Sequence, residues 1–313
     1  MPNLFDNPSS LKFVDVFPCS ILASGWNGKN LTETMGYHLI ALLCFAATFV
    51  LHWVYIRRKQ YLSRRISLPL LGLGFLSITL FLVMRGRSIH ACPIGNPYEI
   101  VSMMVWSSLF FFILISLFFR VNYFGFFTAG LATVTLATIQ LFPDLNYDYQ
   151  VNHTDQSHVV GFHASLAVFS YGIFAVQALF ALMYLLQFQG LARRRMGLFF
   201  SVLPPLLKLE KLQVGTLATG VFVLSVSLFM GSFSIFHGYG AIPVYKLGAT
   251  VLVWIVYVVI LGLYLCKRLV SANFSRASII AFAVALLALV PVDRARHDAD
   301  LPVEAPSNHS NPK

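Results

Sequence analysis

The chain has 313 residues, of which 58% are hydrophobic, 15% aromatic and only 11% charged, and its mean hydropathy is +0.74. A soluble globular protein does not have this composition, so the sequence predicts a polytopic membrane protein. The formal net charge of +10 would suggest a nucleic-acid partner for a soluble protein, but the basic residues gather in alternate loops between apolar runs, and we therefore expect none.

Eight apolar runs are long enough to cross about 30 Å of hydrocarbon as helices. They predict an all-α fold, a bundle of about eight transmembrane helices, in which the last run is the shortest. In chain order the runs are 35–56, 66–84, 100–119, 124–142, 159–186, 213–236, 247–266 and 278–292.

The segments outside these runs have distinct compositions. Residues 1–34 lack the basic region and apolar core of a cleavable signal, so we expect an extracytoplasmic leader before a transmembrane domain at 35–292. Residues 293–313 are polar and rich in Pro, Asn and Asp, which predicts a disordered tail. Residues 188–212 are basic and contain two adjacent prolines, and we expect a short helix on the cytoplasmic surface, either held there by charge or used by a regulatory partner.

The distribution of charge predicts the orientation in the membrane. Of the 22 Lys and Arg residues, 14 fall in one set of four alternate loops, while 11 of the 12 Asp and Glu residues fall on the other side or at its edge. By the positive-inside rule the basic loops are cytoplasmic. Both termini are therefore expected outside.

The four cysteines form no C-x-x-C pair and no haem-attachment motif, which excludes a c-type cytochrome or a dithiol carrier. Cys19 and Cys92 both fall on the predicted outer side. They are able in principle to form a disulfide, or to remain free.

Six of the nine histidines fall near the predicted outer face: His38, His90, His153, His158, His163 and His237. An imidazole nitrogen is an efficient axial ligand for haem iron and also carries protons, so histidines converging on one side of a bundle suggest a cofactor site. The alternative is that each ring sits in the wet interface, where a neutral imidazole costs little. We assign His153 and the two histidines of the tail to that alternative.

At the start of the fifth run, His158 and His163 are five residues apart, which separates them by about 140° around a helix. They cannot both face one metal, and His163 lies about a turn deeper, whereas we expect His158 in the loop above. Ser170 lies within about 20° of the azimuth of His163, and Tyr171 within about 80°. The sequence therefore predicts a weakly polar stripe that begins at His163.

This stripe, H-x6-S-Y, resembles the start of a helix in the CcsA/HemX-like cytochrome c assembly proteins. Three further stretches, between residues 90 and 266, agree with that family in order and spacing. They are the P-x-x-N-x-Y-E segment with its following tryptophan (Pro93, Asn96, Tyr98, Glu99 and Trp106), the next apolar helix (Leu209, Leu212, Gly220 and Gly231), and the pair Lys246 and Trp254.

The family's tryptophan-rich outer loop, W-G-x-x-W-x-W-D, is replaced here by HGYGAIPV. His237 and Gly238 stand where the family has its first Trp-Gly, and Ala241, Pro243 and Val244 replace its later Trp, Trp and Asp. Stacked indoles cannot be made from these residues. The chain is thus similar to the HemX/YpjD-like branch, which lacks the tryptophan loop.

The resemblance implies a cytochrome c assembly-type domain at 35–292 that binds or positions haem at the outer face of a bacterial-type inner membrane. His163 and His237 would be the axial ligands of the iron. The resemblance implies an assembly factor rather than a stand-alone catalyst, with membrane lipid, an apocytochrome c and a Ccs B-like membrane protein as partners. The other residues assigned to the haem site are Glu99, Tyr98, Ser170, Tyr171 and Lys246, with Arg85 and Arg87 as further partners for the propionates.

Two other interpretations remain open from the sequence. One is a non-catalytic HemX-like membrane scaffold or regulator of haem metabolism that acts through the basic residues Arg193, Arg194 and Arg195. The other is a carrier of a small molecule or quinone, which would use the intramembrane Ser170, Tyr171 and Glu99.

Overall fold

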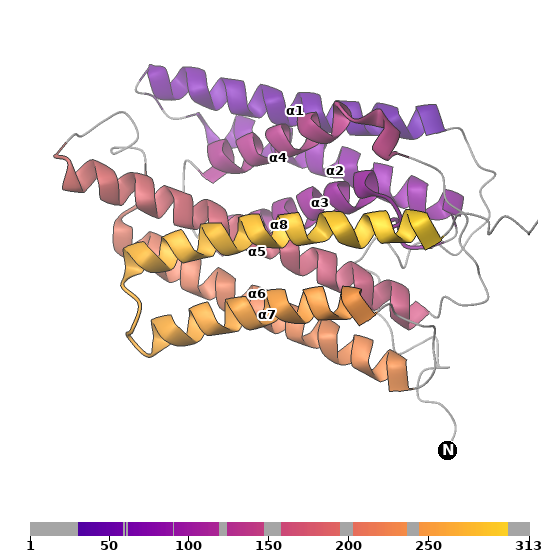
Figure 1. Cartoon of the computed structure of the whole chain (residues 1–313). Helices are drawn as coiled ribbons and strands as arrows, with labels where there is room; N and C mark the ends of the chain where they lie inside the picture. Colours follow the sequence, from indigo (N-terminus) through magenta and orange to yellow (C-terminus); the bar gives the residue numbers. More distant parts are fainter. Residues whose placement is uncertain are drawn as a thin grey trace, which may run out of the picture.

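The computed structural model describes residues 31–58, 60, 62–89, 91–118, 124–146, 158–194, 203–236 and 244–299. Within these ranges the chain is all-helical, with eight α-helices and one short 3-10 turn (Figure 1). The elements are α1 (Leu31–Arg57), α2 (Arg64–Ile89), α3 (Pro97–Phe118), α4 (Phe124–Gln140), η2 (Pro143–Leu145), α5 (His158–Ala192), α6 (Leu206–Phe236), α7 (Val244–Leu265) and α8 (Ser271–Ala299).

Each predicted apolar run coincides with one of these helices, which confirms the polytopic helical membrane bundle. In the described ranges, α1, α2, α3, α5, α6 and α7 are long and apolar enough to span a membrane. The apolar parts of the other two helices are shorter, at Gly125–Gln140 in α4 and Ser271–Leu287 in α8.

The bundle has two groups of helices joined by α5. The first group is α1 to α4, in which α1 packs on α2 and α4, and α3 packs on α4. The second group is α6, α7 and α8, in which α7 packs on both of the others. Figure 1 shows α5 between these groups, where it contacts α3 on one side and α6 and α8 on the other.

Several helix ends differ from the prediction. Helix α1 begins at Leu31, four residues early, and α8 continues to Ala299, seven residues past the predicted end of its run. His158, expected in a loop, is the first residue of α5. A helix continues beyond the hydrocarbon as long as its backbone hydrogen bonds continue, and hydropathy does not report that extension.

The prediction of a short surface helix at 188–212 is also wrong for those of its residues that the structure describes. Residues 188–192 belong to α5, and the two prolines lead directly into α6, because the carbonyl of Pro205 accepts hydrogen bonds from the backbone of Lys208 (2.9 Å) and Leu209 (3.1 Å). Proline is well tolerated at the start of a helix, where its missing N–H would have no partner. Residues 195–202 lie outside the described ranges.

Of the cysteines in the described ranges, Cys92 is disulfide-bonded, while Cys44 and Cys266 are free. Cys19 lies outside these ranges.

Glycines allow α5 to approach its neighbours closely. A Cβ at Gly172 would overlap the Ser107 hydroxyl of α3 and lie 2.9 Å from the backbone oxygen of Met104. The Gly172 carbonyl also accepts a hydrogen bond from Ser108, at 3.0 Å. On the other side, a Cβ at Gly220 of α6 would lie 2.5 Å from the ring of Phe174.

We therefore expect Gly172→Ala to destabilise the protein by about 1–3 kcal/mol, because the added methyl group meets a backbone atom that cannot rotate away. Thermal unfolding of the purified protein in detergent measures this effect. Gly215→Ala is the matched control, since nothing lies within 4 Å of a Cβ there. Equal unfolding temperatures for the two variants would contradict the close packing of α3 on α5.

Candidate functional site

His163 lies near the start of α5, is half-buried, and is held by α6. Its Nδ1 is 2.6 Å from the backbone oxygen of Ser227 and 3.1 Å from the hydroxyl of the same residue. The Ser227 hydroxyl in turn donates to the backbone oxygen of His163 at 3.0 Å. Because a carbonyl oxygen only accepts, the network assigns the proton of a neutral ring to Nδ1, and the lone pair of Nε2 takes no hydrogen bond from a described residue.

The ring of His163 lies against the backbone of α6 one turn further along, at Gly231. A Cβ at that position would be 2.6 Å from Cε1 and 2.9 Å from Nε2 of the imidazole. Any other residue at 231 would displace the ring, so this glycine fixes where the Nε2 lone pair lies.

The second predicted ligand, His237, follows the last residue of α6, Phe236, but lies outside the described ranges. That His163 and His237 share one iron therefore stays a prediction. Lys246 is in the first turn of α7, and the structure describes its backbone but not its side chain.

Tyr98 and its partners form a buried cluster at one end of the first helix group. Its hydroxyl is 2.5 Å from Oε1 of Gln140 and 2.9 Å from Nδ1 of His38. Since the amide oxygen only accepts, Tyr98 donates to Gln140 and accepts from the Nδ1–H of His38. Three helices, α1, α3 and α4, are joined by these two hydrogen bonds.

Glu99 forms a buried ion pair with Arg85 of α2. The two side chains are 0% and 5% exposed, and Nε of Arg85 lies 2.6 Å from Oε1 of Glu99. The other carboxylate oxygen accepts from the backbone N–H of Gly95 at 2.9 Å. Arg85 is thus a partner of Glu99, whereas the sequence suggested haem propionates for it.

Helix α3 begins with a strong local signal next to this ion pair. The side-chain oxygen of Asn96 accepts from the backbone N–H of Glu99 at 2.8 Å, and Pro97 is the first helical residue. An asparagine N-cap followed by proline is a favoured helix start. The cap and the ion pair together fix the loop between α2 and α3.

Neither Ser170 nor Tyr171 makes a described hydrogen bond to His163, and the polar stripe stays a prediction. The Ser170 hydroxyl donates to the backbone oxygen of Ala167, in its own helix, at 2.6 Å. Tyr171 is 5% exposed and packs edge-on against Phe174 in the core of the second helix group. Sequence reasoning also missed Ser227, whose place in an apolar run gives no signal.

Comparison with known proteins agrees with this architecture. A family model described as Cytochrome C assembly protein matches residues 94–295, which include α3 to α7 and nearly all of α8. A relative, Protein HemX of Brevibacillus brevis, is 24% identical over 201 residues, covering 64% of this chain and 74% of the relative.

The chain belongs to the cytochrome c assembly protein family. The resemblance noted in the sequence is confirmed, and with six apolar helices long enough to span a membrane the chain is an integral membrane protein with a role in cytochrome c biogenesis.

Two tryptophans of the cytochrome c assembly pattern join neighbouring helices. The indole N–H of Trp106 in α3 donates to Thr79 of α2 at 2.9 Å, and that of Trp254 in α7 donates to Ser225 of α6 at 2.8 Å. Both rings are buried or half-buried, and their polar ends are satisfied within the bundle. Their position indicates a role in packing.

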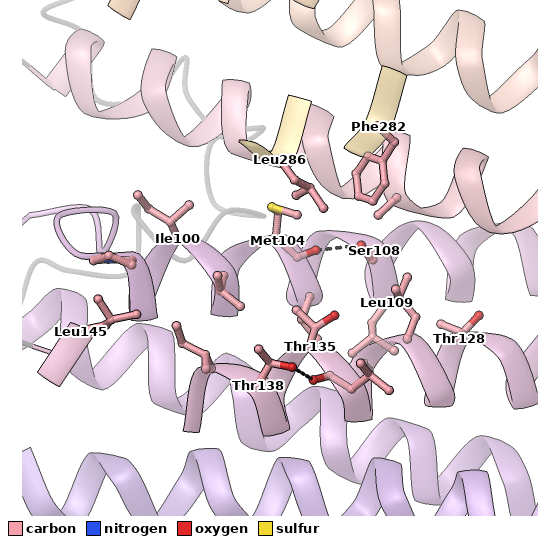
Figure 2. Close-up of a pocket in the computed structure, with 18 residues that line it drawn as sticks. Ile100, Met104, Ser108, Leu109, Thr128, Thr135, Thr138, Leu145, Phe282 and Leu286 are labelled. Carbon is pink, nitrogen blue, oxygen red and sulfur yellow. Dashed lines mark hydrogen bonds between the residues drawn. The ribbon is translucent and has the colours of Figure 1, made fainter. Parts of the chain in front are cut away.

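An apolar crevice of about 570 Å³ lies within the cytochrome c assembly region, between α3 and α4 on one side and α8 on the other (Figure 2). Figure 2 shows the side chain of Met104 pointing across it toward Leu286. Its few polar lining side chains are hydroxyls, among them Ser108 and Thr135, and none of the described residues that line it is a histidine. The crevice is therefore separate from His163.

We expect loss of either partner of the buried ion pair to destabilise the protein by about 3–5 kcal/mol, because a charge is then left uncompensated. Arg85→Met and Glu99→Leu each test this in thermal unfolding. The double variant is the control: with both charges gone it should recover most of the lost stability. Single variants as stable as the native protein would show that the ion pair does not hold α2 on α3.

Proposed function

We propose that this protein binds haem at the outer face of the membrane, with His163 as an axial ligand, and so positions it for cytochrome c assembly. The observation that carries the proposal is the 2.6 Å hydrogen bond from Nδ1 of His163 to the Ser227 carbonyl. A metal-ligating histidine almost always donates its other ring N–H to a carbonyl or carboxylate, which fixes the tautomer and the ring orientation.

The donor at this position fits a haem iron. A neutral imidazole with its proton on Nδ1 offers Nε2 as the ligand atom, and iron in haem takes one or two such axial ligands from the protein. Among the described residues, no three His, Cys, Asp or Glu side chains gather to hold a metal ion by themselves. Bound haem would supply the iron, while the chain would contribute an axial ligand, the orientation of the haem and a fixed depth in the membrane.

His237 and Lys246 would complete the site. His237 follows the helix that holds His163, so a short segment after Phe236 would carry the second imidazole. Lys246, on the next helix, would pair with a propionate as a charge-assisted hydrogen-bond donor.

Glu99 and Tyr98 would act on the site indirectly. The Arg85–Glu99 pair holds the loop that carries Cys92, and a Cβ at Gly161 would lie 3.4 Å from the sulfur of that cysteine. Gly161 precedes His163 by two residues in α5. The ion pair would therefore fix the end of α5 from which His163 projects.

The partners follow from the same proposal. Haem held at the outer face would be passed to an apocytochrome c, with a Ccs B-like membrane protein and membrane lipid around the bundle. The location would be the inner (plasma) membrane of a bacterium.

We expect the purified protein supplied with haem to show a Soret band that is lost or shifted in His163→Ala and in His237→Ala, because each loses an axial ligand. The matched control is His52→Ala, which removes a buried histidine whose ring nitrogens are hydrogen-bonded to Thr48 and Ser67. Native absorption spectra in both ligand variants would overturn the proposal.

Gly231→Ala tests the placement of the ring rather than its presence. The new methyl group would meet the imidazole, so we expect haem affinity to fall by about tenfold or more, as when an outer-shell partner of a metal ligand is lost. Titration with haem measures the affinity, and Gly215→Ala on the same helix is the control because it meets nothing. Equal haem affinities for the two variants would show that His163 is not part of the haem site.

A further inference from the structure

A layer of polar side chains joins all four helices α5 to α8 at the end where α5 stops and α6 starts. Glu210 of α6 accepts hydrogen bonds from Tyr264 of α7 at 2.6 Å and from Ser271 of α8 at 2.5 Å. Tyr184 of α5 lies beside the same carboxylate and Ser271. We call these four residues the carboxylate layer; Glu210 supplies its acceptor.

A step of seven residues along each of the four helices leads from the carboxylate layer to a second layer of four residues. Because α5 and α7 run opposite to α6 and α8, one step of seven leads in a common direction along the bundle (Figure 1). Seven residues are about two turns, or about 10 Å, and return to nearly the same azimuth. The positions reached are Gln177, Leu217, Tyr257 and Ser278, which we call the central layer.

Two observed contacts support this register. Gln213 and Ser275, which lie between the layers on α6 and α8, exchange hydrogen bonds at 3.0 Å. One turn beyond Gln177 on α5, the ring of Phe174 stacks on Tyr257 with the centroids 3.9 Å apart. The four members of the central layer are all fully buried.

The two layers differ at two positions: on α5 Gln177 stands in place of Tyr184, and on α6 Leu217 stands in place of Glu210, so the central layer has no carboxylate. As a result, both polar atoms of the Gln177 amide and the hydroxyls of Tyr257 and Ser278 have no hydrogen-bond partner among the described residues. A buried polar group without a partner is costly, and hydrocarbon offers none. The central layer therefore lacks one polar component.

We propose that the central layer binds water, with one or two molecules in the place that the carboxylate holds in the carboxylate layer. The groups around it are neutral and include both donors and acceptors, which suits water, with its two to four hydrogen bonds, better than an ion. Water enters from the end of the bundle at Glu210, past the Gln213–Ser275 pair. The result is a hydrated polar seam that reaches the middle of the second helix group.

Hydration requires the layer to open slightly, because its polar ends are tightly packed. Helix α8 has room for this movement. Phe282 and Leu286, one and two turns beyond Ser278, line the apolar crevice on the side of α8 that faces α3 and α4 (Figure 2). A small shift of α8 toward the crevice would open space beside Ser278 without breaking a described hydrogen bond between α8 and α3 or α4.

Radiolytic hydroxyl labelling of the purified full-length protein tests the proposal, because it modifies buried side chains that touch bound water. After correction for ring reactivity, Tyr257 should be modified several-fold faster than Phe45, which is equally buried in the first helix group. Gln177→Leu and Ser278→Ala should each slow that modification several-fold. Ser102→Ala, which removes a hydroxyl bonded within α3, is the control and should leave it unchanged. A Tyr257 rate no higher than that of Phe45, or one that neither layer variant changes, would overturn the proposal.

The sign of a stability change gives an independent answer. If water satisfies the Tyr257 hydroxyl, Tyr257→Phe loses hydrogen bonds and lowers the unfolding temperature. If the hydroxyl has no partner, its removal raises that temperature, since a buried unsatisfied group is eliminated. A higher unfolding temperature for Tyr257→Phe would therefore contradict the proposed water site. Neither experiment depends on haem.

Discussion

The structure depends on one constraint, that polar groups inside hydrocarbon must find partners within the protein. Between helices there is little hydrophobic driving force in a bilayer, so hydrogen bonds and close packing decide which helices meet. Nearly every described contact between polar side chains joins two or more helices. The principal ones are Arg85–Glu99, His38–Tyr98–Gln140, Trp106–Thr79, Glu210–Tyr264–Ser271, Gln213–Ser275 and Trp254–Ser225.

Close packing and hydrogen bonds also explain why α5 lies at the centre of the bundle. It meets α3 through Gly172 and α6 through Gly220, where absent side chains let the backbones approach. The hydrogen bonds between His163 and Ser227 then fix the rotation of α5 against α6. A histidine placed in this way is at once a structural link and a candidate ligand, because its two ring nitrogens are separate: one is used by the bundle and the other is left over.

Hydropathy and charge were sufficient to predict the helices and the membrane class, since an apolar run of about twenty residues has few other stable forms. The motif residues Tyr98 and Glu99 were also identified, but not their partners. Gln140 lies 42 residues from Tyr98, and Ser227 lies 64 residues from His163. Such pairings depend on how helices rotate against each other, and a serine or glutamine in an apolar run looks the same whether it faces a partner or lipid. For the same reason the predicted azimuth of Ser170 says little about its chemistry, because a serine can satisfy its hydroxyl within its own helix.

A polar group that has no hydrogen-bond partner after the helices have packed therefore indicates where the bundle could bind a ligand. Both His163 and the central layer have such groups, and their surroundings separate the chemistry that each can serve. His163 is half-buried and lies against Gly231 near the end of α6, so in the proposed function its Nε2 would serve a large ligand. Gln177, Tyr257 and Ser278 are enclosed by four helices and stand beside a seam that already carries hydrogen bonds, so only a small molecule can reach them. Helix α5 carries His163 and Gln177 fourteen residues apart, which is about 21 Å along a helix, so the two proposed sites lie at different depths in the bundle.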